Sequence, residues 1–82
     1  MDAAEVLRTF LVDNHLIRRG QVVKDDDSLF ESGVIDSLAV MALTSHIERV
    51  WGIRVDEDDL IPENFDSLAA MKAYIERKTS QN

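Results

Sequence analysis

Cysteine is absent from this chain of 82 residues, and it has one proline and three glycines. Without a thiol the chain forms no disulfide and offers no cysteine nucleophile, so any thioester chemistry needs a thiol from outside. No apolar run approaches the length that spans a membrane. The first residues lack the basic and apolar regions of a signal peptide. We therefore expect a cytoplasmic protein with no membrane span.

Basic residues are also scarce. Nine Lys and Arg stand against sixteen Asp and Glu, which gives a net charge of −7. Nucleic-acid phosphates need a basic face, so this balance opposes nucleic-acid binding. The acidic run 25–27 invites a calcium interpretation, but an EF-hand loop starting at Asp25 needs glycine where Phe30 stands. We interpret this run and the run 56–59 as solvated, and with two histidines we expect no metal site.

Apolar residues recur at helical spacing in three long segments, separated by polar stretches. Asp2, Asp36 and Asp66 are predicted to cap these helices, and Gly52 is predicted to end the second. A long connection precedes the second helix, and Pro62 favours a short helix before the last. The sequence thus predicts an all-α fold in one domain over 1–82, a four-helix bundle with three long helices, one short helix and a long loop between the first two. The expected helices cover 2–16, 37–51, 62–64 and 67–78.

One face of each expected helix is apolar and should form the core. Trp51 is expected to be substantially buried, and His15 is expected only to favour the end of the first helix. Leu29 and Phe30 are expected to anchor the long loop. The other expected core positions are Val6, Leu7, Phe10, Leu11, Ile17, Val40, Leu43, Ile47, Val50, Phe65, Leu68, Met71, Tyr74 and Ile75.

The start of the second helix is the candidate site. Asp36 caps it, Gly33 gives the incoming chain room to turn, and Ser37 occupies the first helical position. A phosphate ester on Ser37 would lie at the positive end of the helix dipole beside free N–H groups. The alternative is an ordinary helix start, because Asp-Ser-Leu occurs three times, beginning at residues 27, 36 and 66.

The segment 29–38, Leu-Phe-Glu-Ser-Gly-Val-Ile-Asp-Ser-Leu, resembles the phosphopantetheine attachment region of acyl and peptidyl carrier proteins. The resemblance continues through 50–53 and 65–71, and the attachment serine of the family maps to Ser37. Gly33 lies four residues before Ser37, a spacing similar to free-standing carriers such as D-alanyl or aminoacyl carrier proteins. The fatty-acid type has this glycine one residue closer. The Gly-Gly-His-Ser of many peptidyl carriers is absent.

The resemblance implies a monomeric carrier that is not an enzyme. Its 4′-phosphopantetheine arm, derived from coenzyme A, would be attached to Ser37 and hold an acyl or aminoacyl group as a thioester. The implied partners are a phosphopantetheinyl transferase, an acyl or aminoacyl ligase or other loading enzyme, and a downstream acyltransferase or synthase. The cargo stays open between fatty acyl, polyketide, amino acid and D-alanine, and with it fatty acid, polyketide or nonribosomal peptide biosynthesis.

The second helix departs from the acidic helix typical of fatty-acid carriers, since Glu48 is its only carboxylate. Its outer surface should present Leu38, Met41, Ala42 and Ser45. We therefore expect partner enzymes to bind there by apolar contact. Two other classes stay open: a small helical protein-interaction module without a prosthetic group, and an acidic cation-binding protein.

Overall fold

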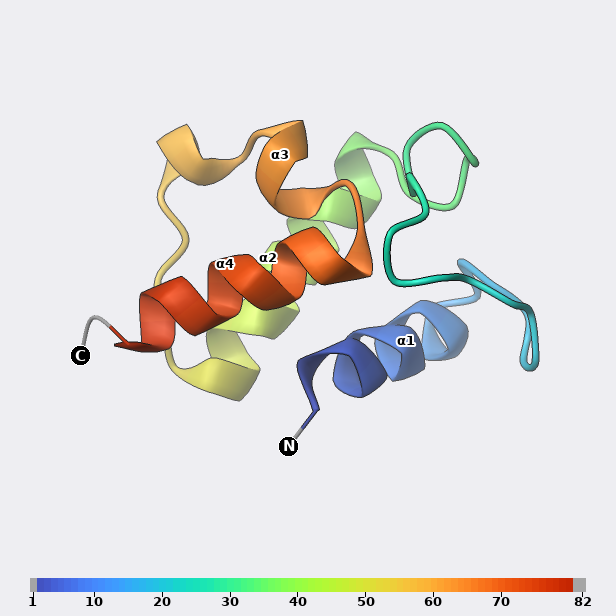
Figure 1. Ribbon diagram of the computed structural model, residues 1–82, viewed down its shortest axis with the longest axis horizontal. Coiled ribbons are helices and arrows are strands. Elements are labelled where there is room, and N and C mark those ends of the chain that lie inside the picture. The colour runs from blue at the N-terminus through green and yellow to red at the C-terminus, as the bar shows by residue number, and fades with distance from the viewer. Residues whose placement is uncertain (1, 81–82) are drawn as a thin grey trace.

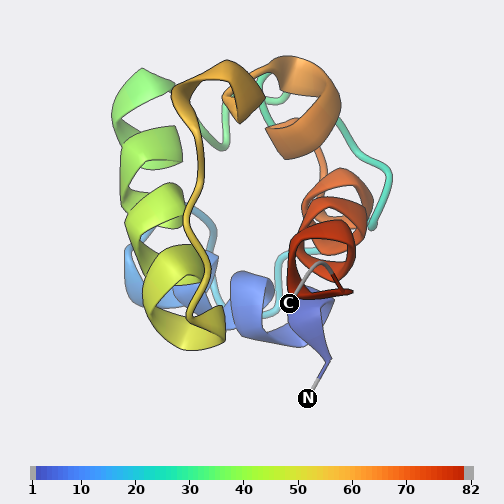
Figure 2. The same ribbon diagram turned by 90° about the vertical axis from the view of Figure 1, so that its left-hand side faces the viewer.

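The computed structural model describes residues 2–80 and confirms an all-helical bundle (Figure 1). Within these residues there is no strand. Helix α4 packs against α1, α2 and α3, and a second view shows the helices around a common centre (Figure 2). No helix in this part of the chain is long and apolar enough to cross a membrane. The elements are α1 (Ala3–Asp13), α2 (Ser37–Trp51), the 3-10 helix η1 (Glu57–Asp59), α3 (Pro62–Phe65) and α4 (Leu68–Ser80).

The core follows the apolar faces of α1 and α4 as predicted. All four expected residues of α4 are buried, and Phe65 is buried beside them. On α1 the expected residues are buried except Val6, which is half-buried. The fully buried side chains, which the predicted faces largely supply, are Leu7, Leu11, Leu29, Leu43, Ile47, Phe65, Leu68 and Met71.

The buried face of α2 shares Leu43 and Ile47 with the predicted stripe but differs from it in its other members. Ala39 and Thr44 are buried beside Leu43 and Ile47, whereas Val40, Val50 and Trp51 are only half-buried. The prediction that Trp51 is substantially buried is met in part, because Trp51 is half-buried and packs against the core. Trp51 is the last residue of α2.

Helix α1 ends three residues before its predicted end at Leu16. His15 adopts a left-handed backbone with φ 59°. The Leu16 N–H donates to the Leu11 carbonyl over 2.8 Å, and the His15 N–H donates to the Val12 carbonyl over 3.0 Å. This is a Schellman motif, in which two donors beyond the helix satisfy its last carbonyls. The backbone of His15 thus ends the helix. The sequence interpretation gave His15 only a favourable interaction with the helix end and did not include this role.

The long loop between α1 and α2 is held at several points. The Ala69 N–H donates to the Asp25 carbonyl over 2.8 Å, and Leu29 N–H donates to the Asp66 carbonyl over 2.7 Å. Leu29 is buried as predicted, together with Val23 and Ile35. Phe30, by contrast, is 39% exposed, so the prediction that it anchors the core is wrong. Its backbone lies in the turn that leads into α2, where the side chain stays partly exposed.

The start of α4 differs from the prediction in which residue caps it. The Ser67 hydroxyl accepts a hydrogen bond from the Ala70 N–H over 3.0 Å, so Ser67 caps α4. Asp66 instead follows the last residue of α3. Its carboxylate is directed to the long loop, where it meets Ser28 and the Phe30 N–H. The prediction of an Asp66 cap is therefore wrong, because contacts with a distant segment engage that carboxylate.

Candidate functional site

Local hydrogen bonds set the start of α2. Asp36 has an extended backbone, with φ −131° and ψ −170°, and its carboxylate accepts from the Ala39 N–H over 2.9 Å. The predicted Asp36 cap is confirmed. Three residues earlier Gly33 has φ 77°, a conformation that favours glycine. The Val34 N–H donates to the Leu29 carbonyl over 2.9 Å, which fixes the turn that brings the chain into α2.

Ser37 is the first residue of α2 and is exposed. Among residues 2–80 its hydroxyl has no hydrogen-bond partner. Because Asp36 engages the Ala39 N–H, the Ser37 and Leu38 N–H groups at the helix start are left to face solvent or a bound anion. The arrangement suits a negatively charged group on the Ser37 oxygen, at the positive end of the helix dipole.

The other two Asp-Ser-Leu serines are engaged in the fold. The Ser28 hydroxyl donates to both carboxylate oxygens of Asp66, over 2.9 and 2.8 Å. The Ser67 hydroxyl caps α4. The first and third copies of the tripeptide therefore bond to each other, and Ser37 alone of the three serines has a free hydroxyl within the described residues.

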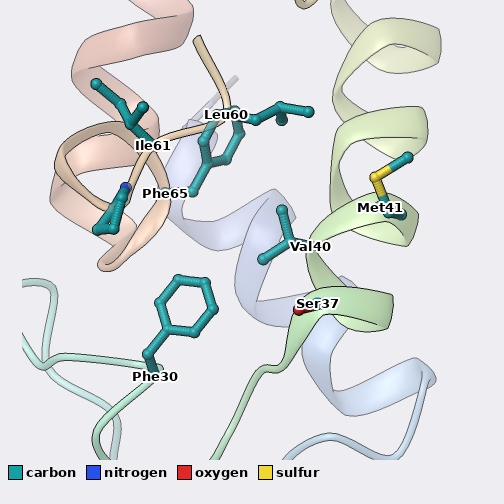
Figure 3. A pocket seen from close by; sticks show the side chains of 8 residues that line it. Phe30, Ser37, Val40, Met41, Leu60, Ile61 and Phe65 are labelled. Atoms are coloured by element: carbon teal, nitrogen blue, oxygen red, sulfur yellow. The ribbon is translucent and has the colours of Figure 1, made fainter. Parts of the chain in front are cut away.

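An apolar groove opens beside Ser37, between α2 and the segment 60–65, with a volume of about 310 Å³. Figure 3 shows Val40 of α2 and Phe30 of the long loop projecting into the space between the two walls, with Ser37 at its edge. Sequence reasoning missed the groove because its walls come from three separate parts of the chain. Besides Ser37, the lining includes Phe30, Val40, Met41, Leu60, Ile61 and Phe65.

The outer face of α2 is exposed where the sequence predicted it. Leu38 is 80% exposed and Met41 is 57% exposed, and Ala42 and Ser45 are exposed as well. Phe30 and Ile61 extend this apolar surface across the groove. The surface around Ser37 therefore holds four of the five large apolar residues that are exposed among residues 2–80.

Glu48, the single carboxylate of α2, is half-buried and accepts from the Val55 N–H over 2.8 Å. It therefore holds the segment after α2 in place, and the outer face of the helix is without an acidic side chain. Within residues 2–80 no group of three or more His, Cys, Asp or Glu side chains could hold a metal ion.

Comparison with known proteins gives one family. The family model described as "Phosphopantetheine attachment site" matches residues 16–75, which is more than half of the chain and includes Ser37. Among curated proteins no relative matches.

A solved structure has a similar fold. A chain of the structure titled "Crystal structure of FAD-dependent dehydrogenase" aligns with a TM-score of 0.73 and 28% identity. The alignment covers 84% of this chain and 97% of that chain, so the two are similar in length. Dinucleotide-binding folds are built on a parallel sheet, and residues 2–80 contain no strand. The likeness is therefore one of helical fold.

Proposed function

The chain belongs to the phosphopantetheine attachment family, whose carrier domains hold 4′-phosphopantetheine covalently, and we propose that Ser37 is the attachment residue. On this proposal the chain holds an acyl or aminoacyl group as a thioester on the arm and presents it to partner enzymes. The observation that supports it is the state of the three serines, of which Ser37 alone has an unengaged hydroxyl, within the matched region and at the start of a helix.

The residues around Ser37 fit the group. The phosphate of the arm would lie beside the free N–H groups of the first turn of α2, which stabilise negative charge. The apolar groove next to Ser37 can cover an apolar part of the arm or its cargo. The arm supplies the thiol that this chain, without cysteine, does not have.

In the attachment reaction the chain itself contributes only the Ser37 hydroxyl. The Ser37 oxygen forms a phosphoester bond, the pyrophosphate bond of coenzyme A breaks, and adenosine 3′,5′-bisphosphate leaves. The serine proton must pass to a base, and we propose that a separate phosphopantetheinyl transferase supplies this base. In this proposal the chain is a substrate and a carrier and not an enzyme, it forms one domain, and a loading ligase and a downstream acyltransferase or synthase are its other partners.

We further propose that these enzymes bind the outer face of α2 through Leu38 and Met41, with Ala42 and Ser45 beside them. The exposure of two large apolar side chains next to Ser37 supports this, since burying them in a complex is favourable.

Intact-mass spectrometry tests the assignment of Ser37. The purified chain is incubated with a phosphopantetheinyl transferase and coenzyme A, and the wild type is expected to gain the mass of one phosphopantetheine. Ser37→Ala is expected to lose the gain completely, while its helical circular dichroism stays unchanged. Ser28→Ala and Ser67→Ala are the matched controls and should keep it.

A Ser37→Ala variant that still gains the arm would show that the assignment is wrong. A wild-type chain that gains no mass with transferases of differing specificity would favour the protein-interaction module without a prosthetic group.

A further inference from the structure

The two walls of the groove beside Ser37 differ in how they are built. One wall is α2, a helix of 15 residues with its own caps. The other is the segment 60–65, which contains only the single turn α3. Helix α3 packs mainly against α4, which lies behind it as seen from the groove. The position of the second wall therefore depends on the contacts that α4 makes with the segment 60–65.

A polar contact links this wall to α4. The Tyr74 hydroxyl donates to the Asp59 carboxylate over 2.7 Å. The Lys78 ammonium lies 3.9 Å from the same carboxylate and 3.7 Å from that of Asp56. The acidic run 56–59, interpreted from the sequence as solvated, is thus partly engaged by α4. Burial and the Asp59 carboxylate raise the pKa of Tyr74 above its ordinary value.

A second set of hydrogen bonds links the same segment to α4 through Asn64 and Arg77. The Asn64 side chain donates to the Asp59 carbonyl over 2.9 Å, and Arg77 donates to the Asn64 side chain over 3.0 Å. The Arg77 guanidinium also lies 5.7 Å from the centre of the Tyr74 ring. Together the two contacts hold both ends of the segment 59–64 against one face of α4.

Tyr74 also connects directly to the groove. It is 2% exposed, and its ring centre lies 5.4 Å from that of Phe65, which lines the groove. Tyr74 therefore contacts Asp59, which directly precedes the wall, by its hydroxyl, and Phe65 of the wall by its ring, while it does not itself line the groove.

We propose that Tyr74 and Lys78 are positioning residues, which set the distance of the 60–65 wall from α2 through Asp59 and Phe65. They thereby determine how far the groove shields the apolar part of the arm and its cargo from water. The inference rests on attachment at Ser37. It assigns a role in that function to side chains that contact neither the attachment residue nor the docking face.

The test uses an arm that reports its own surroundings. Coenzyme A that carries a solvatochromic fluorophore on its thiol is transferred to the full chain, and intact mass confirms the attachment. In the wild type we expect blue-shifted emission and weak quenching by iodide. Tyr74→Phe removes one hydrogen bond to a charged acceptor and keeps the ring. It is expected to red-shift the emission and to increase its quenching by iodide.

A second variant and a double variant separate positioning from general loosening. Lys78→Met keeps an unbranched apolar stem and should change emission in the same direction. Ile61→Ser alters the wall itself, and Tyr74→Phe should add little when combined with it, because both changes act on one groove. The matched control is Asp2→Ala, which removes the cap of α1 far from α3 (Figure 1) and should leave emission unchanged.

The outcomes are distinguishable. A wild-type chain that takes up no labelled arm contradicts the proposed function. Wild-type emission retained in folded, labelled Tyr74→Phe and Lys78→Met contradicts the positioning role alone, as does an equal red shift in Asp2→Ala.

Discussion

His15 is the one non-glycine residue between 2 and 80 with positive φ, at 59°. A side chain in this left-handed conformation is strained by about 1 kcal/mol, which glycine avoids. His15→Gly is therefore expected to raise the free energy of unfolding by roughly 0.5–1 kcal/mol, after the greater freedom of glycine in the unfolded chain is offset. Denaturant unfolding followed by circular dichroism measures it.

Gly52 supplies the reverse experiment. It ends α2 with φ 64°, and no atom lies within 4 Å of the position a Cβ would take. Gly52→Ala should therefore lower the free energy of unfolding by about 1 kcal/mol through backbone strain alone.

The His15 prediction has its own contrary outcome. If His15→Gly lowered the free energy of unfolding, the His15 side chain would have a stabilising contact beyond its backbone role.

His46 gives a pH-dependent prediction. Its ring lies 4.7 Å from that of Phe10, and burial followed by the charge of Arg49 lowers the pKa of His46 from its usual 6.5. Below that pH the unfolded chain takes up a proton that the folded chain resists, so stability falls as pH drops through 6.5 toward the lower folded pKa. His46→Gln should flatten the decline.

Thermal unfolding at about pH 7.5 and about pH 5.5 measures this decline, as a difference between wild type and His46→Gln. His15 is present in both proteins, so any contribution it makes cancels in the comparison. Equal losses of melting temperature in the two proteins would contradict the role of His46.

At the scale of elements, the pair Asp66-Ser67 performs two different functions. Ser67 caps α4, and Asp66 joins α3 to the long loop through Ser28. Ser67→Ala is expected to lower the free energy of unfolding by about 1 kcal/mol, as for other lost caps. Asp66→Ala removes the acceptor of the Ser28 hydroxyl and of the Phe30 N–H, so we expect a larger loss of about 2–3 kcal/mol.

Hydrogen exchange shows which element each variant loosens. Asp66→Ala should speed exchange in the 28–35 turn, and Ser67→Ala in the first turn of α4. Faster exchange confined to α4 in Asp66→Ala would restore the interpretation of Asp66 as a cap.

At the scale of the whole molecule, nearly all acidic residues lie outside α2, which carries the proposed docking face. The net charge is −7, yet Leu38 and Met41 dominate the outer surface of α2 near Ser37. Leu38→Ala and Met41→Ala are expected to lower kcat/KM for loading by about tenfold each, since each removes apolar contact in the complex. Added salt should have a small effect, because it screens mainly exposed charges.

Glu48→Gln is the control for charge. It removes the charge of α2 while an amide oxygen still accepts from the Val55 N–H, whereas Glu48→Ala would also release the segment after the helix. Loading that slows strongly with salt and in Glu48→Gln, and is indifferent to both apolar truncations, would contradict apolar docking.

Most predicted features that depend on nearby residues were recovered from the sequence, although the end of α1 at His15 and the Ser67 cap of α4 were not. The bounds of α2, the Asp36 cap, the Gly52 end and the apolar face of α4 all follow from residues within a few positions of one another. Helical periodicity, caps and left-handed ends are local interactions, so the sequence contains all their partners side by side. The same locality brought Ser37 forward as a candidate.

Tertiary structure alone decided which of the three serines keeps a free hydroxyl and where the groove lies. Ser28 and Asp66 are 38 positions apart, and Tyr74 and Asp59 are 15 apart. The sequence pattern does not show which polar groups find such distant partners, because the packing of the helices brings them together. Phe30 was misplaced for the same reason: its apolar side chain predicts burial, whereas the turn that follows Leu29 directs it to the groove beside Ser37.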